Sequence, residues 1–161
     1  MASEAPYFEF EVTDLGQKLR VSRFSGIEKI STLFQLDVTF VSSDTEIAFE
    51  DVVGKTAVLT MRANEGARHF HGVVSDLEQG AEGKKLASYR ATIVPEVWRL
   101  TQNQNFRIFQ EKTAADIIQQ ILDEASLSES EVKVQLQGSF RAREYCVQYR
   151  ESDWAFINRL M

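Results

Sequence analysis

The sequence is poor in cysteine, histidine and proline, and these shortages narrow the classes of protein it can belong to. Among 161 residues there are one cysteine, two histidines and two prolines. Cys146 has no second cysteine to pair with, so an internal disulfide is excluded. The first residues lack the basic and apolar regions of a secretory signal peptide. No run approaches the roughly 18 to 20 apolar residues that a membrane-spanning helix needs. We therefore expect a protein made and kept in the cytoplasm unless a dedicated machine expels it.

Basic residues are also scarce. The chain has 18 Lys and Arg against 24 Asp and Glu, a formal net charge of -6. Phosphate binding depends on an excess of Lys and Arg, so this balance argues against nucleic acid as the main partner. The short basic spots at Arg141 and Arg143, or Lys84 and Lys85, are typical of a solvated face. With 43% hydrophobic and 26% charged residues, the chain has the composition of a folded globular protein.

The first hundred residues predict six short strands. Their patterns are those of half-buried strands separated by turn signals, at residues 7–12, 19–24, 33–41, 57–63, 69–77 and 88–94. In the third strand, the even positions from Phe34 to Phe40 are the expected buried set. The glycines between residues 79 and 83 predict a hairpin turn with positive φ between the last two strands. Six such strands without a long helix between them predict a small antiparallel barrel or sandwich.

The composition changes at Pro95, which ends the last strand because proline removes a backbone donor. We expect the first domain to end near residue 100, with Trp98 and Leu100 covering the end of the barrel. Beyond it, Thr113 is the predicted N-cap of the strongest helix, and Asp116 supplies the acid of a capping box. The apolar residues of this helix share one face at helical spacing: Ile117, Ile118, Ile121, Leu122 and Ala125.

Two more strands and a final helix are predicted in the rest of the chain. Residues 131–136 and 145–149 alternate in the manner of strands. Ser152 can cap a helix that carries a set of large apolar side chains: Trp154, Phe156, Ile157, Leu160 and Met161. No Gly, Asn or Pro ends this helix, and its apolar surface would lack a partner. We therefore expect the chain to be a fragment of a longer protein.

Few residues could carry chemistry. His69 and His71 would point the same way from a strand, about 7 Å apart, so the two imidazoles could share a metal. They are the only histidines, so any further ligands would have to be carboxylates, which favours ordinary strand histidines. Cys146 lies in a strand-like segment without an activating base nearby and is predicted to be a small core residue. Glu151 and Asp153 are expected to complement a helix N-terminus. We predict no catalytic residue, no metal site and no cofactor.

Motifs spread over nearly the whole chain carry a resemblance to a known family. Residues 24–34 read F-S-G-I-E-K-I-S-T-L-F, and further motifs follow in order at 53–55, 69–74, 89–90, 95–101, 105–110, 116–122, 143–149 and 151–160. No single motif is specific, but so many in one order are hard to obtain by accident. Together they resemble the N-terminal region of VgrG-type spike proteins of type VI secretion systems and their Rhs-linked relatives.

The resemblance implies a fold like the hub of a contractile phage tail, mainly β with minor α. Residues 1–100 would form a small antiparallel β-barrel, and residues 101–161 a connecting helix and the incomplete start of a second barrel. The implied function is a structural hub that trimerises and docks the spike on the hexameric tube protein Hcp. Its implied partners are other VgrG chains, Hcp and baseplate components, without nucleic acid or membrane.

The resemblance also implies where such a protein works. It would be assembled in the cytoplasm without a signal peptide and expelled by the type VI machine. Effector domains of the family are appended beyond the region matched here, so we expect no enzyme activity. Two alternatives stay open: a metal-dependent hydrolase that uses His69 and His71, and a barrel that binds a small ligand in an apolar pocket.

Overall fold

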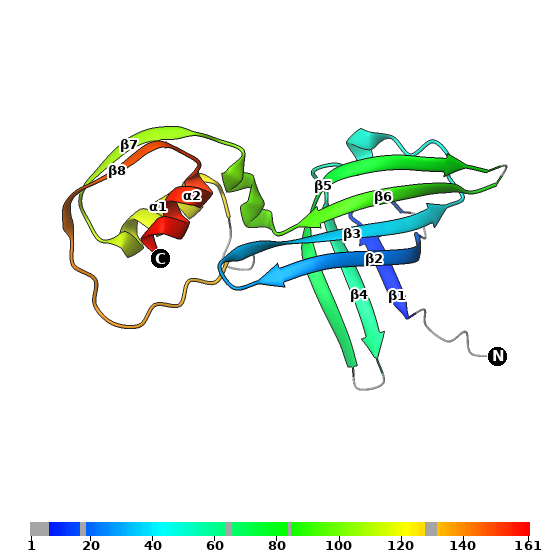
Figure 1. Ribbon diagram of the computed structural model, residues 1–161, viewed down its shortest axis with the longest axis horizontal. Coiled ribbons are helices and arrows are strands. Elements are labelled where there is room, and N and C mark those ends of the chain that lie inside the picture. The colour runs from blue at the N-terminus through cyan, green and yellow to red at the C-terminus, as the bar shows by residue number, and fades with distance from the viewer. Residues whose placement is uncertain (1–6, 17–18, 64–65, 84, 128–131) are drawn as a thin grey trace. The chain divides into compact units, whose positions relative to one another are not determined.

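The computed structural model describes residues 7–16, 19–63, 66–83, 85–127 and 132–161. The chain divides into two compact units, Met1–Pro95 and Glu96–Met161. Strands dominate the first unit, and the second combines a small sheet with helices (Figure 1). Within the described residues, no helix has both the length and the apolar character needed to cross a membrane.

The first unit is one antiparallel sheet. Its strands are β1 (Phe8–Val12), β2 (Arg20–Lys29), β3 (Thr32–Ser42), β4 (Thr56–Ala63), β5 (Gly66–Glu82) and β6 (Ala87–Val94). A short 3-10 helix, η1 (Phe49–Asp51), lies between β3 and β4. The strand order is β1-β4-β5-β6-β3-β2. All six strands predicted from the sequence are confirmed, because their alternating patterns match a sheet with one buried face.

The sheet curls, and β5 is the strand that turns it. The first half of β5 pairs with β4 and its second half with β6, and Val73 takes part in both ladders. Figure 1 shows the change of direction along this strand. A Cβ at Gly72 would overlap the carbonyl oxygen of Val94, so only glycine fits where the two ladders meet. At the far edge, Phe10 of β1 bridges to Leu19, the residue before β2. The result is a half-barrel, and the predicted mainly β fold is confirmed.

Three of the four predicted buried residues of β3 form the centre of this unit's core, and the fourth, Phe34, is only partly buried. Leu36, Val38 and Phe40 are almost fully buried. The Phe40 ring stacks on Tyr89 with ring centroids 5.6 Å apart. The Tyr89 hydroxyl accepts from the amide of Ile47 and donates to the Asp44 carbonyl, both at 3.3 Å. Its polar end is therefore satisfied inside the core.

The expected turn between β5 and β6 differs from the prediction. Residues 80–82 belong to β5, because the ladder continues to the Glu82–Ala87 pair after a register shift. Gly80 and Gly83 do not adopt the positive φ predicted for them. The register shift accommodates the extra residues of β5 within the ladder, so the hairpin turn is shorter than expected.

The second unit pairs a two-stranded sheet with two α-helices. Its elements are η2 (Glu96–Thr101), β7 (Asn105–Lys112), α1 (Ala114–Glu124), β8 (Arg143–Glu151) and α2 (Asp153–Leu160). β7 and β8 are antiparallel. The predicted capping box of α1 is confirmed: the Thr113 hydroxyl accepts from the Asp116 amide at 3.1 Å, and the Asp116 carboxylate accepts from the Thr113 amide at 2.9 Å. The predicted cap of α2 is also confirmed, because the Ser152 hydroxyl accepts from the Ala155 amide.

Three expectations for this unit are wrong. Residues 132–136 form no strand with any described residue, and Glu131 lies outside the described residues. Leu100, which was expected with Trp98 to cover the end of the first barrel, is buried in the core of the second unit. The apolar surface of the final helix was expected to lack a partner. Phe156 and Ile157 of α2 are instead buried, because α2 packs against α1 and η2 within the unit. Of the large apolar side chains predicted for this helix, Met161 alone is among the exposed ones, at 74%, and it lies just after the end of α2.

Candidate functional site

The two histidines share the exposed face of β5, as their alternation predicts. Their ring centroids are 6.1 Å apart. The Nδ1 atom of His69 lies 3.0 Å from the Thr60 hydroxyl, so one imidazole already has a hydrogen-bond partner. In the part of the chain that the structure describes, no three His, Cys, Asp or Glu side chains come together in a way that could hold a metal.

Cys146 lies in the core of the second unit, as predicted. Its side chain is buried among apolar residues on the side of the sheet that faces the helices. The Arg143 guanidinium lies 3.8 Å from the sulfur. The structure therefore places this thiol as a small core residue.

A buried polar network lies on the same inner side of the β7–β8 sheet and centres on Asp153. The Asp153 carboxylate accepts hydrogen bonds from the amide groups of Asn103, Asn105 and Gln148, the last two at 3.0 and 2.8 Å. It also pairs with the Arg107 guanidinium. The Arg107 Nε atom donates to the Gln148 side-chain oxygen at 2.9 Å, and Gln148 is fully buried. The network thus joins β7, β8 and the first residue of α2.

The electrostatics of this network keep Asp153 ionised. Burial alone would raise the pKa of Asp153, but hydrogen bonds from Gln148, Asn105 and Asn103 and the charge of Arg107 outweigh it and hold the pKa below its ordinary value. The sequence identified Asp153 only as a complement to a helix N-terminus. The partners were missed because their side chains converge only when β7 pairs with β8.

The outer side of the same sheet is apolar. We call it the apolar face, and its exposed fractions are Phe106 61%, Ile108 69%, Tyr145 64%, Val147 39% and Tyr149 64%. Cross-strand register places Phe106 opposite Tyr149 and Ile108 opposite Val147. The Phe106 and Tyr149 rings meet edge to face, with centroids 5.4 Å apart. These five side chains form one continuous surface.

This arrangement departs from the usual pattern of a sheet with one solvated face. Apolar residues normally face the core and polar residues the solvent. Here, Arg107 and Gln148 point inward and the apolar face points outward. An exposed apolar patch of a few hundred Å² or more marks an interaction site. We therefore identify the apolar face as the candidate functional site of the described residues.

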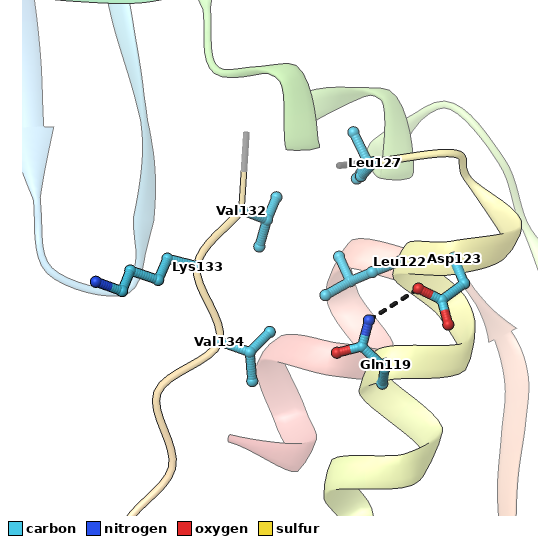
Figure 2. A pocket seen from close by; sticks show the side chains of 7 residues that line it. All are labelled: Gln119, Leu122, Asp123, Leu127, Val132, Lys133 and Val134. Atoms are coloured by element: carbon cyan, nitrogen blue, oxygen red, sulfur yellow. Dashed lines mark hydrogen bonds between the residues drawn. The ribbon is translucent and has the colours of Figure 1, made fainter. Parts of the chain in front are cut away.

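A cavity of about 730 Å³ opens between α1 and the segment that begins at Val132 (Figure 2). Its polar lining side chains are Gln119, Asp123 and Lys133. The Gln119 amide donates to the Asp123 carboxylate at 2.8 Å, and Figure 2 shows Lys133 pointing away from both. The lining therefore presents no set of free polar groups that converge on one point, which a small-ligand site requires.

The comparisons with known proteins agree with the fold. The VgrG1b and VgrG1c type VI secretion system spike proteins of Pseudomonas aeruginosa are 36% and 38% identical to this chain over 144 residues, or 89% of its length. The chain spans about one fifth of their length, 19% and 20%. Its similarity to VgrG-type spike proteins, expected from the motifs, is confirmed.

A solved structure supports the same relationship. The E. coli protein c3393, described as a type VI secretion component with structural similarity to the phage T4 tail proteins gp27 and gp5, matches with a TM-score of 0.81 and 27% identity. The match covers 94% of this chain and 42% of that chain. A family model, phage tail baseplate hub (GPD), matches residues 27–161. The curled sheet, the motifs and these matches together show that the chain belongs to the phage tail baseplate hub family.

Proposed function

We propose that this chain is a structural hub portion of a type VI secretion spike, which trimerises and docks the spike on the hexameric Hcp tube. The relatives named above are spike and tail proteins, which supports a structural role and not an enzymatic one. The observation that carries the proposal is the apolar face, because a protein that works by assembly needs exposed surface of this kind.

The domain arrangement belongs to the same proposal. Residues 1–100 supply the first hub barrel, and residues 101–161 supply the connecting helix and the start of a second. Three copies match a hexameric tube when each copy contributes two similar contact units. The two-stranded β7–β8 sheet supports this assignment, since further strands can extend it. Baseplate components are further partners, and the protein is assembled in the cytoplasm before the machine expels it.

Other functions receive no comparable support. The acidic balance of the chain disfavours nucleic acid. Among the described residues, no three metal-binding side chains come together, so we do not propose a metal-dependent hydrolase. An apolar cavity of about 430 Å³ lies in the second unit beside Ile118, Trp154 and Ile157, and not within the sheet of the first unit, so we do not propose a small-ligand barrel.

Light scattering and tube binding test the proposal. We expect the purified protein to show a mass of three chains at high concentration and to sediment with assembled Hcp tubes. Tubes of an unrelated protein serve as the control for trapping in the pellet. A protein that stays monomeric at every concentration and never sediments with Hcp contradicts the proposal.

A further inference from the structure

We propose that the apolar face of one chain receives the tip of the β2–β3 hairpin of a second copy. This inference rests on the proposed trimer and names the contact that would form it. The hairpin tip is defined here as residues 27–32. The contact is between two different surfaces, one on each unit of the chain.

The hairpin tip carries large apolar side chains that are exposed to solvent. Ile30 is 97% exposed and Ile27 is 60% exposed. The turn after Ile30 places Ser31 at a φ of 59°, so the chain reverses there and Ile30 projects from the end of the hairpin. Turns of this kind usually carry Gly, Asn, Asp or Ser. An isoleucine at this place adds nothing to the core of the first unit, and it is well placed to contact a partner.

The apolar face has the chemistry to receive such a tip. None of its five side chains carries a carboxylate, ammonium or guanidinium group, so covering them buries no such ion. Arg150 lies over the Phe106 and Tyr149 rings, with its guanidinium carbon 6.0 and 5.7 Å from their centroids. This arginine borders the face and can remain in water at the edge of a contact.

The size of the face fits a specific contact. A covered aromatic side chain buries roughly 150 to 250 Å². Three aromatic residues with exposed fractions of 61%, 64% and 64% dominate the face. With Ile108 and Val147 it offers on the order of 500 Å². Since a contact buries similar areas on both partners, full coverage by the tip and the neighbouring side of β2 would bury about 1,000 Å² in total, the lower limit for a specific interface.

Symmetry favours two different surfaces over one surface that packs on itself. A face that stacks on the same face of another copy gives a two-fold dimer, and such a contact cannot close a ring of three. A contact between a face and a tip is head to tail, and a head-to-tail contact closes into a ring of three when the rotation between neighbouring copies is one third of a turn. The second copy of this chain is therefore the partner that agrees with the proposed trimer.

The test uses sedimentation velocity of the full chain over a range of concentrations. Val147→Asp places a charge in the apolar face, and Ile30→Asp places one at the tip. We expect the unchanged chain to associate and each variant to remain monomeric. Val53→Asp is the matched control for Val147, with exposed fractions of 40% and 39%, and Leu86→Asp, 42% exposed in another turn, is the control for the tip. Both controls should associate as the unchanged chain does.

Mixing the two variants gives the sharpest result. The Val147→Asp chain keeps its tip, and the Ile30→Asp chain keeps its face. An equimolar mixture should therefore form dimers and nothing larger. Circular dichroism checks that each variant is folded, and Ile108→Thr and Ile30→Thr repeat the test with residues that suit a strand or turn.

Several results would overturn the contact. These are a monomeric unchanged chain, association that survives in the face or tip variants, loss of association in the controls, and a mixture that stays monomeric. Binding to Hcp tubes is scored separately. A chain that associates but does not bind Hcp contradicts the docking function and is still consistent with the contact. A monomeric chain overturns the contact, whether or not it binds the tubes.

Discussion

The two units use their sheets in opposite ways. In the first unit, the buried residues of β3 and β6 face a shared apolar core, with Phe40 and Tyr89 at its centre. In the second unit, the inner side of the β7–β8 sheet carries the Asp153 network, and the apolar face points to solvent. The first sheet buries its apolar side within its own unit. The second has its own helices on one side and leaves the apolar face on the other side exposed.

This difference predicts that the units depend on different forces. The first unit should respond most to lost packing, and the second also to lost charge. A convenient probe separates them, because both tryptophans, Trp98 and Trp154, lie in the second unit. Tryptophan fluorescence therefore follows the second unit, while hydrogen exchange in β3 follows the first.

The largest effect is expected from Phe40→Ala. Phe40 is fully buried and contacts the rings of Phe10 and Tyr89. Removing such a ring leaves a cavity and should lower the free energy of unfolding by about 3 to 5 kcal/mol. We expect faster exchange of β3 amides, with the tryptophan transition in urea little changed. Phe49→Ala, at a residue 49% exposed, is the control and should cost less than about 1 kcal/mol. An equal shift of both probes would show that the units unfold together.

Asp153→Ala should produce the next largest effect, now in the second unit. It removes the acceptor shared by Asn105 and Gln148 and leaves Arg107 without its buried carboxylate. Breaking one partner of a buried network typically costs about 3 kcal/mol. Urea unfolding followed by tryptophan fluorescence should show the loss, while β3 exchange stays unchanged. Asp123→Ala, on the exposed side of α1, should fall within about 0.5 kcal/mol of the unchanged chain. A similar loss in both variants would count against the network.

The same carboxylate should make the second unit sensitive to acid. The pKa of Asp153 is lowered in the folded state, so its stabilisation is present above the pKa of the unfolded chain and is lost as the pH falls through the folded pKa. Below about pH 4, the tryptophan transition should move to lower urea. Asp153→Asn should narrow this change, because the amide does not titrate. If the variant and the unchanged chain lose stability in parallel from pH 7 to pH 3, Asp153 is not the group responsible.

The sequence predicted the first unit better than the second for a physical reason. Alternation shows which residues of a strand share a face, and in the first unit the more apolar face is the buried one, as at Leu36 and Val38. In β8 the more apolar side is that of Tyr145, Val147 and Tyr149, although Cys146 on the opposite side was predicted to be a core residue. The structure buries the other side, with Cys146 and Gln148.

Alternation does not determine which side of a strand is buried, and it also does not determine whether or with which strand a segment pairs. Residues 132–136 have the pattern of a strand, yet they pair with no described residue. β7 was not predicted, because Phe106, Ile108 and Phe109 place apolar side chains on both faces and leave no clear alternation. The helices were easier, since a cap and an apolar stripe are local signals, as Thr113 and Ile117 show.

The smallest effect we predict tests such a local signal. Thr113→Ala removes the hydroxyl that accepts from the Asp116 amide and so opens the capping box of α1. Loss of an N-cap costs about 1 kcal/mol, and we expect that shift in the tryptophan transition alone. Thr113→Ser keeps the hydroxyl and should retain most of the stability. Since α1 packs on α2 as part of the second core, the helix should remain folded in both variants. A loss of several kcal/mol would mean that the cap, and not the packing of Ile117 and Ile121, holds the helix in place.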